Sequence, residues 1–110
     1  MPTVPAASPV SVNATSINPY VISLQWQPPP PVHQNGIIQY YVVHVSETNT
    51  GRFWTFYSVD PSLLVSALHP YYVYECDVAA ITIGTGPFAN VTIQTNEAGK
   101  LLILSLHLLK

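Results

Sequence analysis

Hydrophobic and polar residues alternate along several short segments of the chain. In VISLQW (residues 21–26) and YYVVHV (40–45), every second side chain suits one buried face. The pattern repeats in NVTIQT (90–95) and in YECDVAA (74–80), where Glu75 and Asp77 point the other way. The positions expected to face inward are Ile22, Leu24, Trp26, Tyr41, Val43, Val45, Tyr74, Cys76, Val78, Ala80, Val91, Ile93 and Thr95. A period of two over several short segments predicts half-buried antiparallel strands.

Turn-forming residues separate these segments. The stretches PPPPVHQNG, ETNTGR, DPS, LHP and GTGP have the composition of turns and loops. Eleven prolines in 110 residues disfavour long helices and suit sheet edges and turns. About seven short strands with such turn signals predict one all-β domain, a seven-stranded antiparallel sandwich of the immunoglobulin type. In this arrangement GTGP is expected to be a loop that precedes the last strand.

The stretch LHPYYVY (68–74) places a leucine, a proline and a tyrosine before one of the alternating segments. In immunoglobulin-like sandwiches, a tyrosine near the start of strand F turns its hydroxyl back to the backbone a few residues upstream. We therefore predict that Tyr74 is this corner tyrosine, that Pro70 stiffens the turn and that Leu68 fills the core beneath it. Cys76 lies two residues later on the same face. Because it is the single cysteine, it has no intrachain disulfide partner, and we expect it to be a small buried hydrophobe.

Together these motifs resemble the fibronectin type III family. The matching features are Pro9 before the first strand, Trp26 followed by Pro28 and Pro29, NGIIQYYVV with Gly36, Ile38 and Tyr41, and then Leu68, Pro70 and Tyr74. The resemblance covers residues 5–97 and leaves an apolar tail of unknown role at residues 98–110. The stretch SLQWQPPPPVHQNGIIQYYVVHVSE is similar to repeats in the ectodomains of receptor-type tyrosine phosphatases and usherin-like proteins.

The resemblance implies a non-catalytic adhesion or spacer module in the extracellular part of a membrane protein, or in a secreted protein. Its contacts would be a protein partner or neighbouring repeats, and it would meet a membrane only through the parent chain. A parent of this kind can carry a separate catalytic domain such as a tyrosine phosphatase. One alternative is direct ligand binding through the loops around residues 30–36 and 81–87. Another is a cytosolic scaffold or muscle-type repeat. The start MPTVPAASPV lacks the features of a secretory signal, so either the protein is cytosolic or this is a piece of a longer chain.

Composition and charge exclude several other classes of protein. Charged residues make up 7% of the chain, the net charge is −2, and three Lys and Arg residues cannot build a phosphate-binding patch. None of the four histidines, among them His44, pairs with another His, Cys or acid at a spacing typical of metal ligands. Glu75 and Asp77 are expected to be a solvated edge rather than an acid–base couple. We expect no enzyme activity, no cofactor, no metal and no nucleic-acid partner.

Two triplets match the acceptor sequence for N-glycosylation. They are NAT at Asn13 and NVT at Asn90, and the alternation of its segment places Asn90 outward. Occupied acceptors require passage through the secretory pathway, so these two residues favour the extracellular setting over the cytosolic one.

The outward positions of the segment 40–45 are unusually apolar. They are Tyr40, Val42 and His44, and the next segment, RFWTFY (52–57), adds either Trp54 and Phe56 or Phe53 and Tyr57, because successive side chains alternate. Exposed aromatic residues mark interaction sites. The sequence therefore predicts a protein-binding face, for which we take Tyr40, Val42, His44, Trp54 and Phe56.

Overall fold

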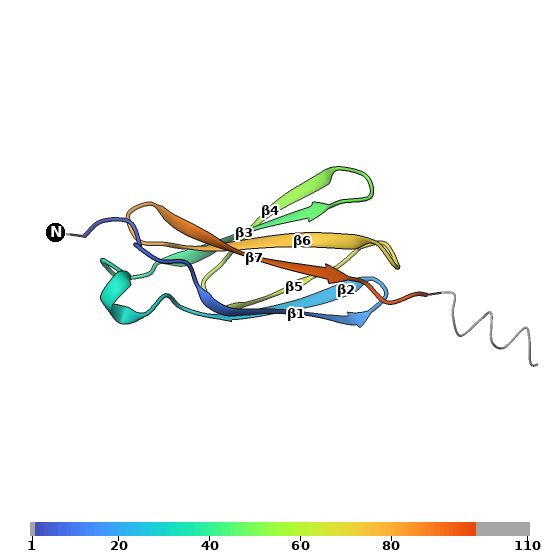
Figure 1. The fold of residues 1–110 in the computed structure, drawn as a ribbon, viewed down its shortest axis with the longest axis horizontal. Helices are drawn as coiled ribbons and strands as arrows, with labels where there is room; N and C mark the ends of the chain where they lie inside the picture. Colours follow the sequence, from blue (N-terminus) through green and yellow to red (C-terminus); the bar gives the residue numbers. More distant parts are fainter. Residues whose placement is uncertain (1, 99–110) are drawn as a thin grey trace, which may run out of the picture.

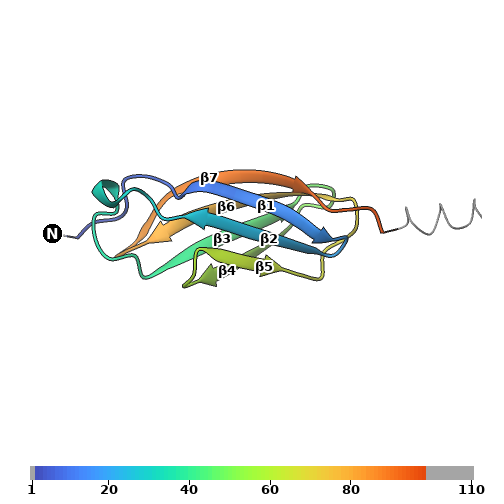
Figure 2. The same cartoon turned by 90° about the horizontal axis from the view of Figure 1, so that it is seen from below.

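The computed structural model describes residues 2–98, which form two packed antiparallel sheets (Figures 1 and 2). One sheet has the strand order β1-β2-β5 and the other β4-β3-β6-β7. The elements are β1 (Val10–Asn18), β2 (Val21–Gln27), the 3₁₀ helix η1 (Pro31–His33), β3 (Tyr40–Glu47), β4 (Arg52–Ser58), β5 (Ser62–Val65), β6 (Val73–Ile81) and β7 (Thr85–Gln94). This confirms the expected seven-stranded sandwich. Residues 99–110, nearly all of the expected apolar tail, lie outside the described residues.

The alternation of each strand supplies the layer between the sheets. The buried core consists of Ile22, Leu24, Trp26, Tyr41, Val43, Val45, Val65, Leu68, Tyr74, Cys76, Val78 and Ala80. The rings of Trp26 and Tyr41 meet edge to face, with centroids 5.3 Å apart. Because Cys76 is fully buried, its thiol is held away from water, and this burial, with the neighbouring charge of Asp77, raises the pKa of Cys76 to about 12.

The last strand begins earlier than the sequence pattern indicates. GTGP (84–87) was expected to be a loop, but β7 starts at Thr85, which pairs with Ile81 after a register shift in β6. The backbone also approaches closely here, because a Cβ on Gly86 would lie 2.7 Å from Cβ of Pro5. Only a residue without a side chain lets the N-terminal segment pack this closely against β7. Because β7 is an edge strand, Pro87 is tolerated there without loss of a ladder hydrogen bond.

Tyr74, at the start of β6, binds the turn between β5 and β6 as expected for the corner tyrosine. The Tyr74 hydroxyl accepts a hydrogen bond from the backbone N–H of His69 at 2.8 Å. Leu68 is buried beneath the turn, and Pro70 is half-buried within it. From the other side, Thr95 donates its hydroxyl to the carbonyl of His69 at 2.6 Å. These bonds attach the crossover between the two sheets to β6 and to the end of β7.

The same hydroxyl also binds a buried acid, Glu47, which was expected in the turn stretch ETNTGR. Tyr74 donates to Oε2 of Glu47 at 2.6 Å, and Glu47, the last residue of β3, has no exposed surface. Thr50 donates to the other carboxylate oxygen, and Nδ1 of His69 lies 2.9 Å from Oε2. A carboxylate only accepts hydrogen bonds, so His69 must carry a proton on Nδ1 to bind it. We call these four residues the corner network.

The corner network changes the acidity of its two central groups. Burial by itself would raise the pKa of Glu47, but the hydrogen bonds from Thr50, Tyr74 and His69 outweigh it and lower the pKa to about 2. Burial, and then the hydrogen bond to Glu47, raises the pKa of Tyr74 to about 12. The carboxylate is therefore charged, and the phenol neutral, over the whole physiological range of pH.

We expect Tyr74→Phe to lower the free energy of unfolding by roughly 1.5–3 kcal/mol, the range for hydrogen bonds to charged groups. The substitution keeps the ring in the core but leaves the Glu47 carboxylate and the His69 N–H each without one partner. Urea titration measures the difference. Equal stability of the two proteins would mean that the hydroxyl contributes nothing.

A second prediction concerns pH. The pKa of Glu47 is lowered on folding, from about 4.3 in an unfolded chain, so its stabilisation is complete above the unfolded pKa. It should be lost as pH falls from about 5 toward 2. Glu47→Gln should lower stability at pH 7 and flatten this acid limb, whereas Glu75→Gln, at an exposed position, should leave it unchanged. Thermal unfolding between pH 2 and 7 provides the test, and an unaltered acid limb in Glu47→Gln would contradict it.

Candidate protein-binding face

The outer surface of the sheet β4-β3-β6-β7 carries a group of ring side chains. Tyr40 and Tyr57 meet edge to face with centroids 5.7 Å apart. His44 stacks on Phe88 at 5.0 Å and 28°, and it also contacts Phe53 at 5.6 Å. Phe53 and Tyr57 are 59% and 64% exposed, so these rings are available to a partner. We call these five residues the aromatic face.

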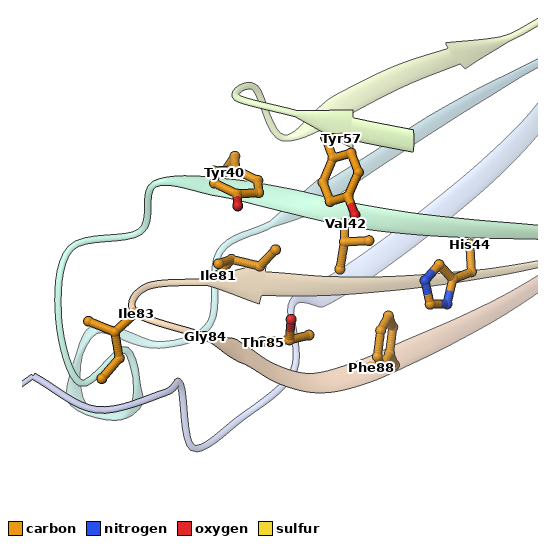
Figure 3. Close-up of a pocket in the computed structure, with 9 residues that line it drawn as sticks. All are labelled: Tyr40, Val42, His44, Tyr57, Ile81, Ile83, Gly84, Thr85 and Phe88. Atoms are coloured by element: carbon orange, nitrogen blue, oxygen red, sulfur yellow. The ribbon is translucent and has the colours of Figure 1, made fainter. Parts of the chain in front are cut away.

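A small buried cluster forms the floor of the aromatic face. Val42, Ala79 and Ile81 are at most 8% exposed although they lie on the outer side of the sheet. The rings and the β6–β7 turn rise around them and enclose a hollow of about 470 Å³ (Figure 3). Its lining consists of Tyr40, Val42, His44, Tyr57, Ile81, Ile83, Gly84, Thr85 and Phe88. A neighbouring hollow of about 360 Å³ is lined by Tyr40, Tyr57, Ser58 and Val59, so the tyrosine pair borders both.

The structure contradicts the choice of Trp54 and Phe56 as outward residues. Trp54 pairs with Val45, and Phe56 pairs with Val43, and both rings pack against the core. Since paired residues of antiparallel strands share a face, β4 turns its other two rings, Phe53 and Tyr57, outward. Arg52 lies over the Trp54 ring, 5.0 Å from its centroid, and covers part of its remaining surface.

The three outward positions expected on β3 differ in exposure. Tyr40 is 37% exposed, His44 is half-buried, and Val42 is only 5% exposed because the surrounding rings cover it. Val42 therefore belongs to the face as floor rather than as a contact surface.

Four hydrogen bonds connect the N-terminal segment to the loops at one end of the sandwich. The N–H of Thr3 donates to the carbonyl of Asn35 at 2.9 Å, and the hydroxyl of Thr82 donates to the carbonyl of Thr3 at 2.6 Å. Asn35 also donates its side-chain amide to Val4, and Ala6 donates to the carbonyl of His33. These polar groups of the loops around 30–36 and 81–87 are therefore already bonded to the N-terminal segment of the same chain.

The asparagines of both predicted acceptor triplets are exposed. Asn13 lies on β1, opposite Gln25 of β2. Asn90 lies on β7, on the same side of the sheet as the aromatic face, and its Nδ2 donates to Oδ1 of Asp77 at 2.8 Å.

Among residues 2–98, no group of three His, Cys, Asp or Glu side chains is arranged to hold a metal ion. The helices of that same part of the chain include none that is long and apolar enough to cross a membrane.

Comparison with known proteins assigns the family. The model of the family described as "Fibronectin type III domain" matches residues 7–95. The chain belongs to the fibronectin type III family. In this family the domain is a non-catalytic module. The third fibronectin III domain of human KIAA0343 protein has the same fold, with a TM-score of 0.74 at 20% identity over 86% of both chains.

Relatives with higher identity are segments of much longer proteins. Roundabout homolog 2 of Homo sapiens is 40% identical over 84 residues, which is 71% of this chain and 6% of that protein. Netrin receptor DCC of Rattus norvegicus is 35% identical over 97 residues, 86% of this chain and 7% of that protein. The FN5 domain of Drosophila Lar has a TM-score of 0.69 at 30% identity, covering 86% of this fibronectin type III chain and all of that one.

Sequence reasoning missed Phe88 and Ile81 as members of the face. Phe88 precedes Asn90 by two residues and therefore shares its outward side. Extending the alternation of 90–95 backward by two residues would have found it. Ile81 could be found in the same way, because it shares a side with Glu75 and Asp77, and the ladder between β3 and β6 keeps this register as far as Ile81.

We expect opposite results from two substitutions on β4. Trp54→Ser should lower the free energy of unfolding by roughly 2–4 kcal/mol, because a ring packed against the core is lost. Tyr57→Ser should cost about 1 kcal/mol or less, since it removes an exposed ring and one aromatic pair. Urea titration of both variants tests the assignment, and a larger loss for Tyr57→Ser would reverse the two faces.

Proposed function

We propose that this fibronectin type III domain is a module of the extracellular part of a larger cell-surface receptor and makes protein–protein contacts there. The relatives support this role. The chain spans 6–7% of the length of Roundabout homolog 2 and Netrin receptor DCC, and the name of the second describes a receptor. The two exposed acceptor triplets fit the same setting, because glycans attach to chains that pass through the secretory pathway.

The observation that carries the proposal is the aromatic face. Tyr40 and Tyr57 lie next to each other above a buried apolar floor and border two hollows. A protein partner can therefore cover the two rings and place its own side chains in the hollows. Tyr is among the commonest hot-spot residues of protein interfaces. A tyrosine ring also contributes a large contact area while only two torsion angles are immobilised.

The chemistry of the face favours a protein over other partners. Apart from Thr85, the side chains that line the hollow are rings and aliphatic groups, and Asp77 and Glu75 lie further along β6. A nucleic-acid partner would need clustered Lys and Arg side chains to neutralise phosphates. Apolar rings with polar tips, by contrast, match the centre of a protein interface, from which charged residues are depleted.

The loops around 30–36 and 81–87 are less suited to be the primary binding surface. Asn35 and Thr82 use their side chains to hold Val4 and Thr3, so a ligand would have to displace the N-terminal segment to reach these groups. Ile83, which is 70% exposed, instead extends the hollow beside the aromatic face. We therefore assign the contact to the sheet rather than to the loop tips.

The proposal predicts that the double substitution of Tyr40→Ser and Tyr57→Ser abolishes binding while the domain stays folded. A dimeric fusion of the domain would be tested against a panel of cell-surface ectodomains, and self-association would be followed by sedimentation velocity. Ile17→Ser is the matched control, because Ile17 is a 54% exposed apolar residue on β1 in the other sheet. Binding that survives the double substitution, or that Ile17→Ser removes equally, would contradict the assignment of the face.

A further inference from the structure

The outward side chains of the four-stranded sheet lie in rows that cross the strands. One row runs Tyr57, Val42, Ala79 and Phe88, and the next runs Thr55, His44, Asp77 and Asn90. The first row is apolar and supplies Tyr57, Val42 and Phe88 to the lining of the hollow. The second row is polar and supplies only His44. Asn90 is the last residue of the polar row, and it lies next to Phe88, the last residue of the apolar row.

Phe88 is the nearest ring to Asn90 along the strand. The two residues are separated by one position, so their side chains emerge on the same face about 7 Å apart. Phe88 is 42% exposed, and one face of its ring stacks on the His44 ring. Figure 3 shows Phe88 next to His44 at the end of the hollow away from Ile83. The ring thus offers a fixed apolar surface beside the Asn90 amide.

The exposed Asn90 amide has the chemistry of a glycosylation acceptor. Thr92 completes the acceptor triplet, and the amide is held by the hydrogen bond from Nδ2 to Asp77. In the transfer, Nδ2 attacks C1 of the first sugar of a lipid diphosphate-linked oligosaccharide. The bond between C1 and the diphosphate oxygen breaks, Nδ2 loses one proton, and the lipid diphosphate leaves. One N–H remains on Nδ2, so the glycosylated amide still has one hydrogen-bond donor.

We propose that Asn90 carries an N-linked glycan whose first sugar packs on Phe88 and covers the His44 end of the aromatic face. The C–H face of a pyranose ring is apolar and flat, so it packs on an aromatic ring as another apolar group would. The glycan confines a protein partner to the end of the hollow formed by Tyr40, Tyr57 and Ile83. The confinement rests on the protein-binding role proposed above, and the glycan rests on the extracellular setting proposed there, whereas the packing of the sugar on the ring is tested without any partner.

The chain contains its own control site. Asn13 is also an exposed acceptor on a strand, but the residue two positions before it is Ser11 and its cross-strand partner is Gln25. A sugar on Asn13 therefore has no ring at either of these two positions. Thr15→Ala and Thr92→Ala remove one acceptor each, so every glycoform can be made separately.

The test uses the full chain secreted from animal cells, with glycans trimmed enzymatically to a single sugar and checked by intact mass. With Phe88 present, the sugar on Asn90 should raise the melting temperature by about 4 °C relative to the bare Thr92→Ala site. In the Phe88→Leu background, which keeps β7 apolar without a ring, the same comparison should show no rise. The sugar on Asn13 should give a shift that does not depend on Phe88.

A chemical footprint reports on the coverage of the face. Carbethoxylation of His44 should be at least several-fold slower in the Asn90 glycoform, while the rate at His33, an exposed histidine in η1, stays unchanged. Nitration of Tyr57 should be unaffected. An unoccupied Asn90 in the secreted protein, an equal melting shift in the Phe88→Leu background, or an unchanged rate at His44 would overturn the proposal. Loss of binding in Tyr40→Ser/Tyr57→Ser protein made without glycans would still support the protein-binding face, so the two proposals fail separately.

Discussion

The buried carboxylate of Glu47 is the constraint on which the arrangement of the sandwich depends. A charge removed from water is costly unless polar groups satisfy it. Here the donors come from Tyr74, Thr50 and His69, which belong to β6, the β3–β4 turn and the β5–β6 turn. These donors surround the carboxylate only when the crossover, β3 and β6 are in their native positions. The hydrogen bonds that satisfy the Glu47 carboxylate therefore form only when the whole sandwich is folded.

The aromatic face follows from the same register. With Glu47 opposite Tyr74, the ladder between β3 and β6 also sets Val42 against Ala79 and Tyr40 against Ile81. That pairing gathers a second apolar cluster on the outer side of the sheet, where a sandwich ordinarily meets water. Rings from β4 and β7 then cover the cluster without closing over it. A partner can bind to this surface because the floor is already packed and the rings around it are partly exposed.

The polar row beside the face balances this exposure. His44 belongs to both regions, since it stacks on Phe88 and pairs across the strands with Asp77. The chain has few charges to keep an apolar surface soluble. A sugar at Asn90 would supply polarity where the rings end, and it would do so without adding charge to the binding surface. In this arrangement one end of the sheet, at Tyr40 and Tyr57, would contact a partner, and the other end, at Asp77 and Asn90, would face water.

The sequence by itself determined the alternating segments in β2, β3, β6 and the later part of β7 with their inward faces, the family and the corner tyrosine. Each of these depends on short-range signals, such as the alternation around Val43 and Val45 or the spacing of Leu68, Pro70 and Tyr74, that survive without a structure. Only the tertiary structure decided which side of β4 is buried. Both sides of this strand carry two aromatic rings, and the pairing with β3 turns Trp54 and Phe56 inward. Likewise, Glu47 is the first residue of the stretch ETNTGR, which has the composition of a turn, and one donor that satisfies its buried carboxylate is Tyr74, a residue 27 positions away. Alternation is a property of neighbours in the chain, whereas the satisfaction of a buried charge and the choice between two apolar faces are properties of neighbours in space.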